Sequence, residues 1–195
     1  MTEGKNRSVS WISWLLGASG LALAFTWGLA EGTLFFLVPD LVLTLTALFS
    51  FKIALRQTGA AVIGAMIAGA LMFSWSSVDY AQSSDVVMSV PFVNESMTDT
   101  VRADLDADGA LGLLKGPFSG IPYKVYAIEA PGRVGLLPFL IATIPARLER
   151  LFSGVLLFAA IGYWQRRRIQ TKPHLALIGY GLYWSVLYTW YWTSI

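Results

Sequence analysis

Apolar stretches, interrupted at intervals by charged residues and prolines, make up most of the chain. Four of these stretches fall within the roughly 17–25 residues that an apolar helix needs to cross a bilayer. They are residues 11–27, 58–75, 148–164 and 175–192. The first could instead be a signal peptide, because Gly28-Leu29-Ala30 loosely resembles a cleavage site. Its tryptophans favour a membrane span with aromatic residues at the interfaces.

A fifth apolar stretch, residues 30–51, contains Glu31, Asp40 and, directly before the aspartate, Pro39. A carboxylate at the centre of a transmembrane helix costs about 2.5–3.5 kcal/mol on insertion scales. The proline removes a helical amide and disfavours helical geometry at the residue before it. We therefore expect a re-entrant hairpin whose tip is surrounded by protein or a wet cavity. Its expected half-helices are residues 33–37 and 41–49, and its expected tip is residues 38–40.

Prolines also recur through residues 116–145 and argue against one continuous straight helix there. We expect a second hairpin with arms at 116–130 and 132–145. Hairpin plus span then occurs twice, at 31–75 and 116–164. One full crossing separates the two hairpins, so they should enter from opposite faces. Such an inverted repeat is typical of transporters with a site near the bilayer midplane.

The composition fits one membrane unit across residues 1–195, because 55% of the residues are hydrophobic and the mean hydropathy is +0.59. The predicted fold class is therefore an all-α polytopic membrane protein. A net charge of +2 gives no support for nucleic-acid binding. With no cysteine and one histidine, His174, the sequence does not favour a zinc site or a thiol enzyme. We expect neither an enzyme nor a cofactor.

Seven of the 12 acidic residues lie between residues 76 and 115, which we therefore place outside the bilayer. Asp104, Asp106 and Asp108, followed by Gly109, resemble the start of an EF-hand calcium loop. Lys115 stands where that loop needs its bidentate glutamate, so a solvated acidic loop is the preferred interpretation. Residues 95–105 could form a short helix. The basic residues 166–172 are best placed in the cytoplasm, on the opposite face.

Glu31 and Asp40 are the main candidates for chemistry, because they are acidic residues within apolar sequence. A carboxylate between apolar surroundings and a nearby cation can take up and release a proton near neutral pH. The alternative is that such a carboxylate caps the N-terminus of a half-helix. We also expect Asp40 to approach Lys124, a cation of the second hairpin.

Two segments resemble the signatures of a known family. Glu31, an apolar run and then Pro39-Asp40 with three further apolar residues are similar to the first signature of the DedA family, in its YqaA-like branch. The segment SGIPYKV at 119–125 is similar to that branch's second signature. These proteins belong to the SNARE-associated Golgi, or VTT-domain, superfamily. The matches and the segments that follow them cover residues 30–75 and 115–165.

The resemblance implies a multi-pass protein of the bacterial inner membrane that moves a phospholipid or a polyprenyl-phosphate carrier across the bilayer. Glu31 and Asp40 match the acidic residues of the first hairpin and would couple transport to protons. Lys124 matches the second cation of the pattern R-F-x-P-G-x-R, although the first cation is replaced by Phe118. The resemblance also makes Lys124, Arg147 and Arg150 candidates to bind a lipid headgroup, alone or in a homo-oligomer.

Simpler interpretations stay open for these cations and for the whole chain. Lys124 could extend to the membrane interface, and Arg147 could pair with Glu149 instead of a lipid. The chain could also be a non-transporting scaffold that supports envelope integrity, or a small-ion or proton exchanger. Leaflet exchange of a labelled lipid in vesicles, measured beside ion flux, separates these functions.

Overall fold

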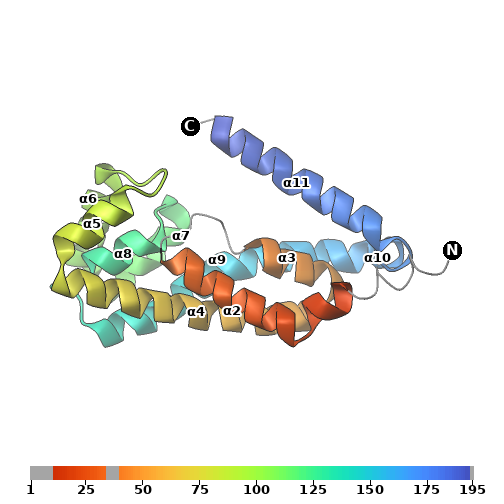
Figure 1. The fold of residues 1–195 in the computed structure, drawn as a ribbon, viewed down its shortest axis with the longest axis horizontal. Coiled ribbons are helices and arrows are strands. Elements are labelled where there is room, and N and C mark those ends of the chain that lie inside the picture. The colour runs from red at the N-terminus through yellow and green to blue at the C-terminus, as the bar shows by residue number, and fades with distance from the viewer. Residues whose placement is uncertain (1–10, 34–39, 194–195) are drawn as a thin grey trace.

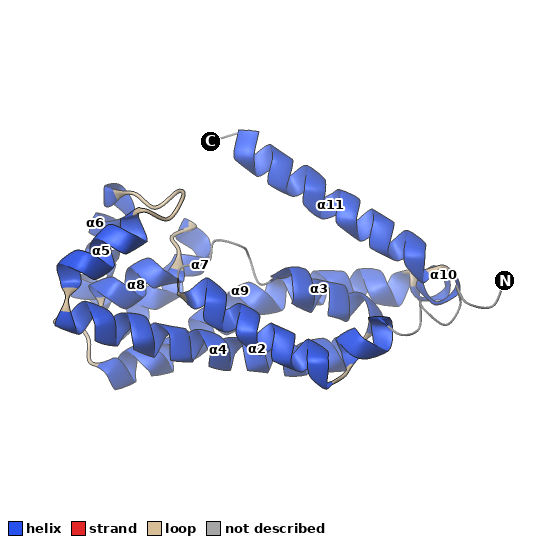
Figure 2. Cartoon of the chain, viewed as in Figure 1, coloured by secondary structure: helices blue, strands red, loops and turns tan. Residues whose placement is uncertain are grey.

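The computed structural model describes residues 11–33 and 40–193, and these residues form helices and loops without a strand (Figure 2). The all-α prediction is therefore confirmed. A short helix over residues 11–16 precedes the labelled elements. Those elements are α2 (Ala18–Gly32), α3 (Asp40–Phe49), α4 (Phe51–Val78), α5 (Tyr80–Met88), α6 (Glu95–Asp108), the 3₁₀ helix η1 (Gly109–Lys115), α7 (Gly116–Ser119), α8 (Tyr123–Glu129), α9 (Leu136–Trp164), α10 (Arg166–Thr171) and α11 (Pro173–Thr193).

The two longest helices of the bundle, α4 and α9, lie along the molecule and run in opposite directions (Figure 1). Helices α5, α6 and α8 gather at one end, and α10 lies at the other end (Figure 1). Helix α11 leaves the bundle obliquely from the α10 end. The acidic and basic segments thus lie at opposite ends of the bundle.

Small residues let α2 and α4 pack side by side in the same direction. A Cβ on Gly28 would lie 2.1 Å from the carbonyl oxygen of Ala61, and one on Gly64 would lie 2.3 Å from that of Phe25. Neither site therefore has room for a side chain. Close helix packing is the role that glycine and alanine play in membrane helices as well.

The first helical hairpin uses α2 as its incoming arm. Gly17 separates residues 11–16 from α2, and no proline interrupts the helix before it ends at Gly32. The predicted stretch 11–27 is therefore not one continuous helix, and its second part belongs to α2. Helix α3 returns beside α9, with Thr44 next to Gly154. The predicted half-helix 33–37 and the tip at Pro39 lie outside the described residues, except that Thr33 follows α2 as a turn.

The second hairpin is shifted relative to its prediction. Its incoming arm is η1 with α7, and α8 returns after a turn at Gly120, whose φ of +72° favours glycine. The predicted arm 132–145 and the span after it instead form one continuous helix, α9. Pro138 lies in the first turn of α9, where no intrahelical amide bond is needed. Pro145 removes one internal bond, and the helix continues past it.

The acidic segment is helical rather than a loop. The short helix predicted at 95–105 is confirmed as α6, and the side chain of Asn94 caps it by accepting a hydrogen bond from the Met97 amide at 3.0 Å. Buried residues of this segment, including Val87, Val101 and Leu105, share a core with α8 and the start of α9. Helices α5 and α6 therefore form a folded cap on one end of the bundle.

Membrane crossing has its clearest support in α4 (Phe51–Val78). Among the described helices it alone is long and apolar enough, by length and composition, to cross a membrane. The predicted span 58–75 lies inside it. In α9, Arg147, Glu149 and Arg150 interrupt the apolar sequence.

Candidate functional site

Buried charged and polar side chains meet halfway along the bundle, where the two hairpins approach each other. Glu31 is in the last turn of α2, Arg147 is near the middle of α9, and Tyr123 and Lys124 begin α8. Their exposed fractions are 7%, 3%, 7% and 3%. Glu31 of the first hairpin and Tyr123 of the second both contact Arg147 of α9 at one buried site, which we call the central site. Lys124 follows Tyr123 in the chain and is buried as well.

An ion pair links the two halves of the chain at the central site. The Arg147 guanidinium donates from Nη1 to Oε1 of Glu31 at 3.2 Å and from Nη2 to Oε2 of the same carboxylate. This two-bond geometry is the strongest form of an arginine–carboxylate contact. Burying both charges is costly, and either charge alone would be costlier still. The pair therefore fixes α2 against α9.

Two of the simpler interpretations are wrong for this pair. Glu31 lies at the C-terminal end of α2, where the helix dipole disfavours a negative charge, so it does not cap a helix N-terminus. Arg147 forms its ion pair with Glu31 and not with Glu149, which is exposed.

Tyr123 of α8 also contacts the Arg147 side chain. The tyrosine ring lies 5.2 Å from the guanidinium carbon, close enough for a cation–π contact. Its hydroxyl shares a 2.9 Å hydrogen bond with Thr143, one turn before Arg147. A Cβ on Gly69 of α4 would lie 2.0 Å from this hydroxyl, so the glycine makes room for the ring. Sequence reasoning did not select Tyr123, although it belongs to the segment SGIPYKV.

Of the remaining predicted residues, Arg150 lies beside this pair. Arg150 is half-buried and, with Arg147 and Tyr123, lines a cavity of about 20 Å³, which is about enough for one water molecule. The Nε atom of Arg147 is buried without a hydrogen-bond partner within the described residues. Asp40 is the first residue of α3, but its side chain lies outside the described residues, and so does its predicted approach to Lys124.

Known proteins do not identify the chain. No family model, curated protein or solved structure matches it. The resemblance to the DedA family therefore rests on the two sequence segments, and the residue roles that it implies stay predictions.

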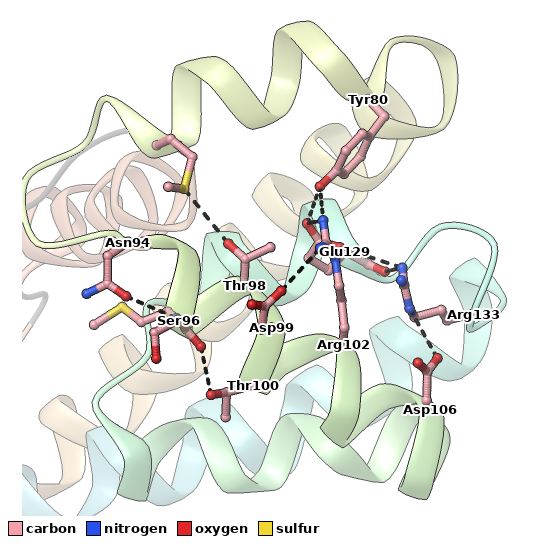
Figure 3. Close-up of polar contacts among 12 residues, drawn as sticks. Tyr80, Asn94, Ser96, Thr98, Asp99, Thr100, Arg102, Asp106, Glu129 and Arg133 are labelled. Atoms are coloured by element: carbon pink, nitrogen blue, oxygen red, sulfur yellow. Dashed lines mark hydrogen bonds and ion pairs between the residues drawn. The ribbon is translucent and has the colours of Figure 1, made fainter.

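A second buried carboxylate, Glu129, connects the cap to α8 (Figure 3). It is 1% exposed. Tyr80 of α5 donates to its Oε1 at 2.6 Å, and Arg102 of α6 donates from Nε to its Oε2 at 2.8 Å. The Nη1 atom of Arg133 lies 3.6 Å from Oε2 of Glu129. The hydrogen bond to Glu129 raises the pKa of Arg102 above its usual range, so Arg102 stays charged. Glu129 was not among the predicted site residues, although a carboxylate in an apolar stretch was the available signal.

The calcium-loop hypothesis is wrong for Asp104, Asp106 and Asp108. Because α6 continues to Asp108, its helical period points alternate side chains in different directions. Asp104 and Asp108 instead bind Lys115 at 2.9 and 2.7 Å, and Asp106 pairs with Arg133 at 3.1 Å. In the part of the chain that the structure describes, no group of three or more histidines or carboxylates could hold a metal ion.

Replacing Glu129 should loosen the cap. We expect Glu129→Leu to lower the free energy of unfolding by about 1.5–3 kcal/mol, because Arg102 and Tyr80 lose a charged hydrogen-bond partner. Asp99→Ala is the matched control: its carboxylate, 75% exposed, pairs with the same Arg102, and we expect a loss of at most about 1 kcal/mol. Limited proteolysis between α5 and α6 measures the opening. Equal protease resistance of Glu129→Leu and wild type would contradict this role.

Proposed function

We propose that this chain is a polytopic membrane protein that moves an anionic lipid, a phospholipid or a polyprenyl phosphate, across the bilayer through the central site. The observation that carries the proposal is the buried Glu31–Arg147 pair, which joins the first hairpin to α9 halfway along the bundle. Charges within a membrane protein are expensive and usually mark a transport pathway or a proton relay.

The directions of the helices support an inverted repeat of re-entrant hairpins. Helices α2 and α3 form a hairpin whose ends at Gly32 and Asp40 lie near mid-bundle, entered from the α10 end (Figure 1). The hairpin of η1, α7 and α8 enters from the capped end. Each hairpin is followed by a long helix, α4 or α9, of 28 or 29 residues. At 1.5 Å per residue these helices are about 42–44 Å long, more than the hydrocarbon thickness of about 30 Å.

The exposed surface of these long helices supports contact with lipid tails. On α4, Ile63 and Leu71 are 55% and 57% exposed, and on α9, Leu137 and Ile141 are 69% and 60% exposed. Apolar side chains exposed along two long helices suit a lipid environment better than water.

The charges at the central site favour an anionic ligand. Among its described side chains, the cations Arg147 and Arg150 outnumber the one carboxylate, Glu31. Lys124, the third predicted headgroup ligand, is buried on the neighbouring helix α8. A phosphate could replace Glu31 as the bidentate partner of Arg147, because both groups match the planar guanidinium. The released carboxylate would then take a proton, which would couple lipid binding to pH. Asp40 is the second predicted proton carrier of this scheme.

Lipid exchange in vesicles tests the function. We expect purified protein to move a fluorescent phosphatidylglycerol between leaflets, and Lys124→Gln to reduce the rate about tenfold or more, the loss expected when a charged hydrogen bond is removed. Lys124→Arg should retain part of the rate, because the positive charge persists. No exchange of phosphatidylglycerol or of a polyprenyl phosphate by the wild type would contradict the proposal.

A small-ion exchanger is the second candidate. The observation that favours it is the cavity beside Arg147, whose volume of about 20 Å³ suits an ion or a water rather than a headgroup. The same vesicles loaded with a pH-sensitive dye separate the two candidates. Proton flux without lipid movement would support the exchanger, and neither activity would support a scaffold.

Labelling of single cysteines tests the topology, because the natural chain has none. Cysteines placed at Ser84 in α5 and at Thr171 in α10 should react with a membrane-impermeant reagent from opposite sides of the membrane. Reaction of both from the same side would contradict the arrangement of two opposed hairpins.

A further inference from the structure

We propose that a groove between α9, α10 and α11 binds one anionic phospholipid, at a place separate from the central site. The groove has a volume of about 710 Å³, within the range of small-molecule sites. Its walls are mainly aliphatic and aromatic side chains of α9 and α11, including Leu157, Phe158, Ile161 and Tyr183. Arg168 and Lys172 line it at the α10 end.

The positive charge at the α10 end of the groove favours an anionic ligand. Residues 150–195 contain no aspartate or glutamate. Within the described residues, neither Arg168 nor Lys172 takes part in an ion pair with a carboxylate, and both are exposed. Basic residues beside a membrane helix attract anionic headgroups.

The apolar part of the groove favours binding of an acyl chain. Leu157, Leu175 and Tyr183 are 54%, 52% and 45% exposed, although they line a concave surface. Tyr180 holds α11 to the bundle by donating to the carbonyl oxygen of Leu41 at 2.5 Å. The ring of Tyr183 packs edge-on against Phe158 of α9, with centroids 5.4 Å apart, and beyond it α11 diverges from the bundle (Figure 1). One ligand with an anionic head and an apolar tail satisfies both parts of the groove, and a phospholipid in a bilayer is such a ligand.

The inference rests on the proposed membrane location, but not on lipid transport. A phospholipid bound in the groove would lie between α9 and α11 and so stabilise the observed angle between these helices. Its binding can be measured without any movement of lipid between leaflets, so failure of one proposal does not imply failure of the other.

Two glycines of α11 provide a matched test of the groove. A Cβ on either Gly179 or Gly181 meets no atom within 4 Å, so both accept a larger residue. Gly179 lines the groove and Gly181 does not. Native mass spectrometry of the full chain, released from nanodiscs of phosphatidylglycerol and phosphatidylcholine, should show one retained phosphatidylglycerol in wild type and Gly181→Leu. Gly179→Leu should lose it, because the new side chain fills the groove.

A second pair of variants tests the headgroup contact. The double variant Arg168→Gln with Lys172→Gln removes both charges. We expect it to weaken retention of phosphatidylglycerol by about fivefold for each cation removed. Arg167→Gln is the control, because Arg167 lies on the same helix but does not line the groove. Equal retention by Gly179→Leu and Gly181→Leu would overturn the proposal. So would equal retention of the two lipids by wild type, or a dimer of this chain that Gly179→Leu abolishes.

Discussion

Arg147→Met should destabilise the folded protein by about 3–5 kcal/mol, because Glu31 would stay buried without its cation. The pair is 3% and 7% exposed, so water cannot replace the lost partner without opening the contact between α2 and α9. Thermal or denaturant unfolding in detergent measures the loss. Arg150→Met is the control: this half-buried neighbour on the same helix has no ion pair to Glu31, and its loss should be about 1 kcal/mol or less.

The double variant Glu31→Leu with Arg147→Met separates stability from function. Replacing a buried ion pair by apolar side chains is often neutral or stabilising, so most of the lost stability should return. Lipid exchange should not return, because neither the anion-binding guanidinium nor the proton-accepting carboxylate is present. A double variant that exchanges lipid at the wild-type rate would show that the pair only holds the helices together.

Gly64→Val should have the second largest effect, a loss of about 3 kcal/mol or more, because overpacking of a tight contact leaves no low-energy rotamer. Its Cβ alone would approach the Phe25 carbonyl oxygen to 2.3 Å, so α2 and α4 must separate. Gly59→Ala in the same helix is the matched control, since no atom lies within 4 Å of its Cβ. That change should stabilise α4 by up to about 1 kcal/mol.

The same substitution connects packing to the central site. A displaced α2 carries Glu31 away from Arg147, so lipid exchange should fall together with stability. Unfolding in detergent and exchange in vesicles are measured on the same preparations. Wild-type stability of Gly64→Val would contradict the close contact between α2 and α4.

The sequence could predict that Glu31 and Arg147 belong to a functional site, but not that they form an ion pair with each other. Glu31 and Arg147 were selected individually, one as a carboxylate in an apolar stretch and one from the resemblance to a known family. Their partnership joins residues 116 positions apart, and no local pattern encodes such a contact. Tyr123 and Glu129 acquire their roles only through contacts with other helices, with Arg147 in one case and with α5 and α6 in the other.

Prolines produced the main errors in helix boundaries, because their effect depends on position within a helix. The aspartate spacing left a calcium loop open as the less favoured alternative. Pro138 falls in the first turn of α9 and interrupts nothing, but no local pattern shows where that turn begins. Asp104, Asp106 and Asp108 have the spacing of a calcium loop, but α6 continues through them and directs them to Lys115 and Arg133.

The sequence by itself determined the helical class, the apolar span within α4 and the segregation of acidic and basic residues. These properties follow from composition and local periodicity, which each segment carries on its own. Only the tertiary structure decided where α2 and α9 begin and end, which charges are neutralised, and that α11 leaves a groove beside Arg168. These properties depend on which helices pack together, and packing is set by side chains that are distant in the chain.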